Sequence, residues 1–229
     1  MTTMVSVRVL GISGSPRKGR NTEHLLRAAL EAASEVEGVE TELLRLSDYR
    51  VLPCDGCNIC VREGVCPLDE EDDMGELKER LQEADAVIIA APSYFSSVPG
   101  ILKNLMDRSR PLKMGGHLLS GKVISALSVS ALRSGGGEAV VEEILRFGLT
   151  HGMIVVGGCG DPLTQSWSGI GTLQGDAGWR RTSDDGIALR DSRGRREARG
   201  RGRPDPEERT PTGGVRPSAL RGSRRGTSG

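Results

Sequence analysis

Short apolar runs alternate with amphipathic stretches over roughly the first two thirds of the chain. Five runs enriched in Val, Ile, Leu and Ala have the length of buried strands. These predicted strands are Val5–Ile12, Val39–Leu46, Ala86–Ala91, Val123–Val129 and Met153–Val156. Between them, apolar residues recur at helical spacing with charges in between, which is typical of helices that cover a sheet. The predicted helices begin at Asn21 or span Met74–Ala84, Pro99–Arg108 and Glu138–Leu149.

Strict alternation of strands and helices predicts one α/β domain. The wholly apolar run Ala86–Ala91 is typical of a central parallel strand covered on both faces. We therefore expect a doubly wound, five-stranded parallel sheet. Such sheets bind ligands in the loops that follow the carboxyl ends of their strands. The predicted ligand loops are residues 13–22, 92–98 and 130–137, which are the most polar or glycine-rich of the chain.

The first of these loops has the composition of an anion site. Hydroxyl groups, Arg17 and a helix N-terminus converge there, and together they suit a phosphate. The spacing Gly11-x-x-Gly14 does not match a dinucleotide fingerprint, and Arg20-Asn21 replaces the Lys-Ser/Thr of a P-loop. The alternative is an ordinary Gly/Ser turn in which Asn21 or Thr22 caps the helix.

The other two loops suit a flat ring and a close backbone approach. Tyr94 and Phe95 follow a central strand, where aromatic side chains can cover a ring while nearby groups bond to its edge. Gly135, Gly136 and Gly137 remove side-chain bulk from the loop after the fourth strand. The alternatives are aromatics that pack under the next helix and a flexible connector.

Four of the five cysteines lie close together in the sequence, with the spacing Cys54-x2-Cys57-x2-Cys60-x5-Cys66. This continuous run differs from the separated pairs of zinc sites and is similar in style to ferredoxin motifs. It predicts four thiolate ligands for one [4Fe–4S] cluster, with structural or redox-sensing thiols, or zinc, as alternatives. Cys159 stands apart and is interpreted as a small buried residue.

The remaining titratable residues show no pattern of catalytic partners. His24, His117 and His151 are scattered, so each is interpreted as a hydrogen-bonded or solvated histidine. The acidic run Asp69–Asp73 is interpreted as a solvated face or a helix start rather than a metal site.

The charge distribution divides the chain in two, although its formal net charge is zero. Residues 1–175 hold 17 basic and 23 acidic side chains, whereas residues 176–229 hold 14 arginines and 8 acids. We expect a folded domain at residues 1–178 and a disordered, low-complexity basic tail at residues 179–229. Nucleic-acid binding through this tail is a distant alternative, because aromatic stacking residues are scarce there. No apolar run has the length of a membrane span and no signal peptide is evident, so we expect a cytoplasmic protein.

Several motifs occur together in one order: Gly14-Ser-Pro-Arg-Lys-Gly-Arg-Asn-Thr22, Cys54-Asp-Gly-Cys-Asn-Ile-Cys60, Cys66, Asp72-Asp-Met74 and Pro92-Ser-Tyr-Phe95. In this combination the chain resembles the NADPH-dependent FMN reductase-like proteins of flavodoxin-like fold, and specifically the iron–sulfur flavoproteins. The resemblance covers about residues 5–178.

The resemblance implies bound FMN, with its phosphate held by Ser13, Ser15, Pro16, Arg17, Asn21 and Thr22. It implies a flavin ring against Pro92, Ser93, Tyr94, Phe95, Ser96, Ser97 and Val98 and against Ser134, Gly135, Gly136 and Gly137. The four cysteines would carry a [4Fe–4S] cluster near the flavin of a neighbouring subunit in a homodimer or homotetramer. Electrons would pass from a donor such as ferredoxin or NAD(P)H to an acceptor. A cluster-free, NAD(P)H-dependent FMN or quinone reductase is the alternative.

The tail departs from the family pattern. Family members have a further helix after the region Gly171–Gly178, whereas the sequence from Trp179 onward has no helical periodicity. Its Arg/Gly/Pro/Ser bias is what an out-of-frame reading of a GC-rich gene would produce. We hypothesise a frame shift near Gly178. Resequencing that returns the same frame, together with a protein of this full mass in cells, would exclude this hypothesis.

Overall fold

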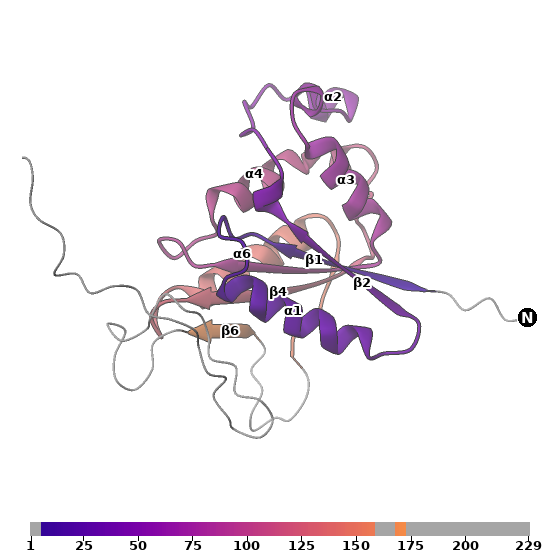
Figure 1. Ribbon diagram of the computed structural model, residues 1–229. Coiled ribbons are helices and arrows are strands. Elements are labelled where there is room, and N and C mark those ends of the chain that lie inside the picture. The colour runs from indigo at the N-terminus through magenta and orange to yellow at the C-terminus, as the bar shows by residue number, and fades with distance from the viewer. Residues whose placement is uncertain (1–5, 159–167, 173–229) are drawn as a thin grey trace, which may run out of the picture. The chain divides into compact units, whose positions relative to one another are not determined.

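The computed structural model describes residues 6–158 and 168–172, so the predictions for Cys159 and for the tail 179–229 lie outside the described residues. The strands lie close to the predicted ranges (Figure 1). They are β1 (Val7–Ser13), β2 (Val39–Arg45), β3 (Ala86–Pro92), β4 (Val123–Ser130), β5 (Ile154–Val155) and β6 (Gly169–Thr172).

The four longer helices were predicted from their periodicity, but two short ones were not. The helices are α1 (Asn21–Ser34), α2 (Ile59–Glu63), α3 (Met74–Glu83), α4 (Gly100–Arg108), α5 (Arg110–Met114) and α6 (Gly137–Thr150), with 3₁₀ turns η1 (Leu46–Asp48) and η2 (Pro67–Glu70). A helix as short as α2 or α5 has too few residues to show a periodic apolar face. Among the described residues, no helix is both long enough and apolar enough to cross a bilayer.

The sheet is parallel and doubly wound, as predicted, with the order β2-β1-β3-β4-β5. This is the flavodoxin-like strand order, in which the chain direction across the sheet reverses between β1 and β3. The fifth position differs from the single strand expected at Met153–Val156. There β5 pairs only with Val123 and Ile124, and β6 pairs with Leu127–Ser130. Two short strands therefore share the edge of β4, because β5 ends before the longer β4 does.

Each face of the sheet is covered by different helices. Leu26 and Leu30 of α1 pack on Val9 and Ala90 on one face, whereas α3, α4 and α6 supply the larger core on the other. Figure 1 shows α1 on the opposite side of the sheet from α3 and α4. Gly11 allows α1 to lie close to β1, since a Cβ there would come within 2.5 Å of the Leu30 side chain. The helices on both faces leave the carboxyl ends of the strands to carry the loops.

Candidate functional site

The three predicted ligand loops follow β1, β3 and β4 and meet at one edge of the sheet. Strand register brings their starts together: Ser13 pairs with Ala90, and Pro92 pairs with Val129. The edge includes the reversal point between β1 and β3, where doubly wound sheets have their binding crevice. The site is therefore built from segments far apart in the sequence.

Exposure divides the predicted FMN residues into three groups. The exposed ones are Pro16, Arg17, Tyr94, Phe95, Ser96 and Ser134. The half-buried ones are Asn21, Pro92, Ser93, Ser97, Gly135 and Gly136. The buried ones are Ser13, Ser15, Thr22, Val98 and Gly137. The loops thus combine an accessible surface with a buried base.

The loop after β1 is shaped by its own hydrogen bonds. The Arg17 amide donates to Ser15 Oγ at 3.1 Å, which fixes the turn that follows the buried Ser15. Gly19 adopts a left-handed φ of +62°, and its amide donates to the Glu23 carboxylate at 2.8 Å. Helix α1 then begins at Asn21, with Arg20 rather than Asn21 or Thr22 as its N-cap. The loop therefore ends at a helix N-terminus that favours an anion.

Glu23, in the first turn of α1, is a buried carboxylate that sequence reasoning missed. It accepts hydrogen bonds from Arg27 at 2.8 Å and from Arg45, at the end of β2, at 2.8 Å and 2.9 Å. The Arg45 hydrogen bond is the largest cause that holds the pKa of Glu23 at about 2, and the Gly19 amide and Arg27 act in the same direction against burial. The two guanidinium groups compensate a negative charge that would otherwise repel an anion at this loop.

The loop after β3 contains a tight turn with unusual backbone angles. Tyr94 and Ser97 exchange backbone hydrogen bonds of 3.0 Å and 3.1 Å. Between them, Phe95 and Ser96 have φ values of 51° and 62°, the left-handed region that both central residues of this turn type require. Glycine, asparagine or aspartate normally occupies such positions, so an aromatic residue there stores strain. The Phe95 side chain is fully exposed, which is typical of a binding surface rather than of packing under the next helix.

Neighbouring elements hold this turn in place. Glu143 of α6 accepts hydrogen bonds from Ser97 Oγ at 2.8 Å and from the Val98 amide at 3.2 Å. Ser93 Oγ donates to the Gly135 carbonyl of the loop after β4. Gly136 has a φ of +81°, and a Cβ there would lie 2.5 Å from Ser96 Cα. The loops after β3 and β4 consequently form one continuous wall.

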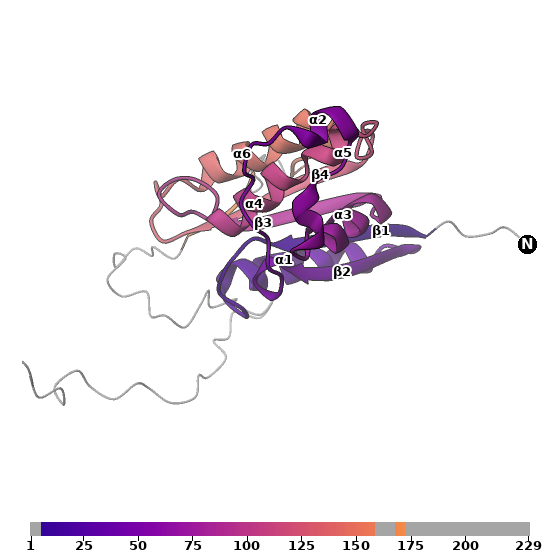
Figure 2. The same cartoon turned by 90° about the horizontal axis from the view of Figure 1, so that it is seen from above.

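The four clustered cysteines lie on residues 54–66, called the cysteine segment below. This segment consists of α2 and the loops on either side of it, and it lies apart from the wall. Cys54 and Cys57 are exposed, Cys60 and Cys66 are half-buried, and all four thiols are free. The structure does not draw these thiols into a metal site: across residues 6–158 and 168–172, no three His, Cys, Asp or Glu side chains are grouped to hold an ion. Helix α2 lies beside α5 (Figure 2).

A buried ion pair closes the base of the cysteine segment. Arg108 of α4 and Asp72 both have fully buried side chains, and Arg108 Nη1 donates to Asp72 Oδ2 at 2.7 Å. The interpretation of Asp69–Asp73 as a solvated face was therefore wrong for Asp72, whereas Asp73 does start α3 as its N-cap. Sequence reasoning missed Arg108 because its helical position alone does not distinguish a buried cation from a solvated one.

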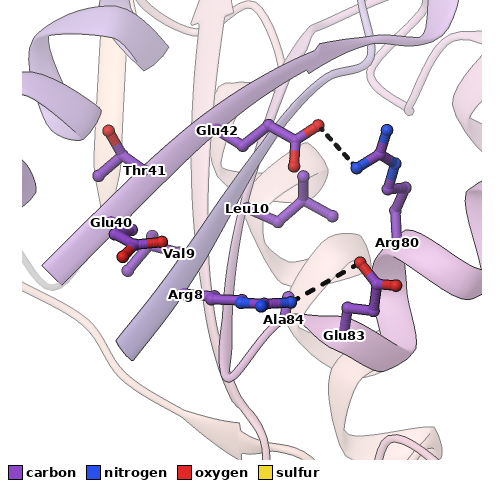
Figure 3. A pocket seen from close by; sticks show the side chains of 9 residues that line it. All are labelled: Arg8, Val9, Leu10, Glu40, Thr41, Glu42, Arg80, Glu83 and Ala84. Atoms are coloured by element: carbon purple, nitrogen blue, oxygen red, sulfur yellow. Dashed lines mark ion pairs between the residues drawn. The ribbon is translucent and has the colours of Figure 1, made fainter. Parts of the chain in front are cut away.

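One hollow of about 250 Å³ lies elsewhere, between β1, β2 and α3 (Figure 3). Its charged side chains are largely paired across it: Arg8 with Glu83 at 3.8 Å and Arg80 with Glu42 at 3.6 Å. Arg8 lies at the start of β1, so the hollow is far along the strand from the loops after Ser13. It is an ion-paired surface groove, and the site that the loops form is distinct from it.

His151, the C-cap of α6, has a strongly lowered pKa. It is buried, and its Nε2 shares a hydrogen bond of 2.9 Å with Ser109 Oγ. In the described part of the chain its Nδ1 has no partner. Burial, together with smaller effects of the positive charges of Lys113 and His117, lowers the pKa of His151 from 6.5 to about 4.

The lowered pKa of His151 predicts that the stability of the fold depends on pH. Because the unfolded state binds the proton first, stability falls as the pH drops from 6.5 to about 4, by on the order of 3 kcal/mol. Urea unfolding of wild type and His151→Gln at about pH 7.5 and about pH 4.5 measures this difference. We expect the variant to lose most of it and the exposed-site control His24→Gln to retain it. Equal pH dependence in all three proteins would contradict the assignment.

The fold and its loops define the class of protein. A solved NAD(P)H:quinone oxidoreductase from Methanothermobacter marburgensis superposes with a TM-score of 0.53 at 22% identity, covering 69% of this chain and 87% of that one. This likeness shows the shared flavodoxin-like fold. Residues 7–161 match the family model described as NADPH-dependent FMN reductase.

Two curated relatives narrow the class further. An iron–sulfur flavoprotein of Methanocaldococcus jannaschii is 46% identical over 170 residues, covering 74% of this chain and 86% of that protein. An iron–sulfur flavoprotein of Archaeoglobus fulgidus is 39% identical over 183 residues, covering 80% and 89%. The chain belongs to the NADPH-dependent FMN reductase family, in its iron–sulfur flavoprotein subgroup, and is an oxidoreductase.

Proposed function

We propose that the chain is a redox flavoprotein that binds FMN at the loop edge of the sheet and a [4Fe–4S] cluster on its cysteine segment. Family membership and the names of the relatives support both groups. One observation supports the proposed FMN binding most directly: the strained Tyr94–Ser97 turn exposes an aromatic ring beside the glycine loop after β4. A turn of this kind persists only where surrounding contacts hold it, and such strain clusters at binding sites.

The residues of this edge fit FMN. Ser13, Ser15, Arg17, Asn21 and Thr22 would hold the phosphate, because hydroxyl groups, a guanidinium and the α1 N-terminus all favour an anion. Residues 92–98 and 134–137 would hold the ring. At Gly136 a Cβ would fill space that Ser96 already uses, so the wall keeps its shape only with glycine there. Tyr94 and Phe95 would cover the ring and keep water from it.

The cysteine segment fits an iron–sulfur cluster by its donor set. Cys54, Cys57, Cys60 and Cys66 are free thiols on one segment, and a [4Fe–4S] cluster takes four thiolates. Since the thiols are not gathered in the structure, we infer that the segment closes around the cluster when it binds. The left-handed residues Gly56 and Asn58 supply turns between the first three cysteines.

Together the two groups would make an electron carrier. When bound, FMN converts between two-electron and one-electron transfers and a cluster handles single electrons. We propose that electrons come from ferredoxin or NAD(P)H, and that the protein is a cytoplasmic homodimer or homotetramer. The chain itself would contribute binding, orientation and exclusion of water.

The test is an absorption spectrum with iron and sulfide analysis of anaerobically purified full-length protein. We expect a flavin spectrum with a broad iron–sulfur shoulder and about four irons per chain. Cys60→Ser should keep the flavin and lose the iron. Cys159→Ser, which changes the cysteine outside the predicted ligand set, should keep both. Absence of flavin from the wild-type protein would refute the proposal.

A cluster-free NAD(P)H-dependent FMN or quinone reductase is the second candidate. The match to the NADPH-dependent FMN reductase family supports it, because transfer of a hydride from NADPH to a flavin needs no cluster. Flavin without iron in the wild-type protein, together with rapid oxidation of NADPH by an added quinone, would select this function over the electron carrier.

A further inference from the structure

Arg108 has a fully buried side chain that donates four hydrogen bonds. Its Nη1 donates to the Leu52 carbonyl at 3.0 Å and to Asp72 Oδ2 at 2.7 Å. Its Nη2 donates to Asp69 Oδ1 at 2.9 Å and to Asp72 Oδ1 at 3.2 Å. Asp72 alone would be enough to compensate the charge of Arg108. The additional hydrogen bonds to Leu52 and Asp69 connect the guanidinium to two further positions of the chain.

Those partners flank the cysteine segment on both sides. Leu52 comes shortly before Cys54, and Asp69 comes shortly after Cys66. Asp72 strengthens the closure, since its carboxylate also accepts the Leu52 amide at 2.7 Å. One guanidinium therefore joins the two ends of the segment that carries all four predicted ligands. Fixing the ends of a loop removes part of the entropy that ligand binding would otherwise cost.

A second contact from the same helix supports this assignment. Asn104, about one turn before Arg108 on α4, donates from Nδ2 to the Val51 carbonyl at 2.9 Å. Helix α4 thus holds the chain at two consecutive residues before the first cysteine. On the other side, Lys78 of α3 forms an ion pair with Asp69.

One donor of Arg108 is left over. Within the described residues its buried Nε has no hydrogen-bond partner, and a buried donor without an acceptor is costly. Burial by itself lowers the pKa of Arg108, but the hydrogen bonds to Asp72 and Asp69 raise it above its ordinary value. Asp69 links Cys66 to this guanidinium, because the Asp69 amide donates to the Cys66 carbonyl at 3.1 Å while the Asp69 carboxylate accepts from Arg108 Nη2.

We propose that Arg108 is a positioning residue for the cysteine ligands, which fixes both ends of the cysteine segment and donates its remaining N–H to the sulfur of Cys66 in the cluster-bound protein. This inference rests on the proposed function, because it gives the cysteines a cluster to hold. A hydrogen bond and a positive charge at a ligand sulfur stabilise the more negative, reduced state of a cluster.

The test compares wild type with Arg108→Lys, which keeps the charge but loses the planar fork and Nε–H, and with Arg108→Met. Lys103→Met is the matched control, since Lys103 forms an exposed ion pair with Asp107 on the same helix. Hydrogen exchange in full-length protein reports the loop ends. We expect exchange across residues 50–74 to be about tenfold faster or more in both Arg108 variants, and exchange in β1 and β3 to be unchanged.

The second readout is the midpoint potential of the cluster, which a merely structural role would not move. We expect it to be lower in Arg108→Lys than in wild type or Lys103→Met. Unchanged exchange and unchanged potential in Arg108→Lys would overturn the inference. If Arg108→Met does not fold, Arg108→Lys and Asp72→Asn decide the outcome.

The outcome for the proposed function can be separated from the outcome for the positioning role of Arg108. If wild-type protein holds flavin but no iron, the cluster half of the proposed function is refuted. Co²⁺ titration, followed by the thiolate-to-cobalt absorption band, then tests the positioning role alone. Weaker Co²⁺ binding by Arg108→Lys than by Lys103→Met would support that role, and equal binding would overturn it.

Discussion

Replacing Glu23 with alanine is expected to lower the free energy of unfolding by about 3 kcal/mol, because two partly exposed arginines lose the buried acceptor of their charge-assisted hydrogen bonds. Arg27 and Arg45 both donate to this carboxylate, and the Gly19 amide loses its acceptor as well. The loop after β1 then loses the hydrogen bond from the Gly19 amide to Glu23 that sets its last turn. We therefore expect weaker FMN binding along with lower stability, measured by urea unfolding and by flavin titration.

The matched control is Glu31→Ala, since Glu31 is an exposed acid on the same helix. This change should alter stability by less than about 0.5 kcal/mol. A stability loss in Glu23→Ala no larger than in Glu31→Ala would contradict the role of Glu23.

The pH dependence provides a further check on Glu23. Its folded-state pKa of about 2 lies below the ordinary 4.5, so its stabilisation is present above pH 4.5 and is lost as the pH falls toward 2. Unfolding of Glu23→Ala should lack this part of the acid sensitivity. This window lies below most of the His151 window, so His151→Gln and Glu23→Ala should change different parts of the profile.

Gly136→Ala is the second change with a large expected effect. A Cβ at Gly136 would lie 2.5 Å from Ser96 Cα, and the φ of +81° is unfavourable for any residue with a side chain. Left-handed strain and overpacking together should cost about 2–4 kcal/mol. Because the clash falls on the Phe95–Ser96 turn, FMN affinity should fall by about tenfold or more.

Gly100→Ala is the control for this prediction. Gly100 starts α4 without a left-handed φ, and a Cβ there would meet no atom within 4 Å. Alanine at this position should be neutral or slightly stabilising. Equal flavin affinity in Gly136→Ala and Gly100→Ala would show that the wall between the two loops has no part in flavin binding.

The sequence alone predicted the α/β class, the parallel sheet and the loops that would meet. Those predictions succeeded because they depend on local features: apolar runs such as Ala86–Ala91 mark buried parallel strands, and Gly/Ser loops mark their ends. Parallel strands then bring their carboxyl ends to one edge by topology alone. The motifs around Gly14, Cys54 and Pro92 also indicated the family to which the chain belongs.

Long-range contacts were decided only by the tertiary structure. Arg108 bonds to Leu52, which is 56 residues away, and no local periodicity marks such a pair. The same holds for Glu23 with Arg45, for the turn at Phe95 that Glu143 holds, and for the shared edge of β4. A charged residue reads the same in sequence whether it is solvated or buried, because its environment is set by the segments that fold against it.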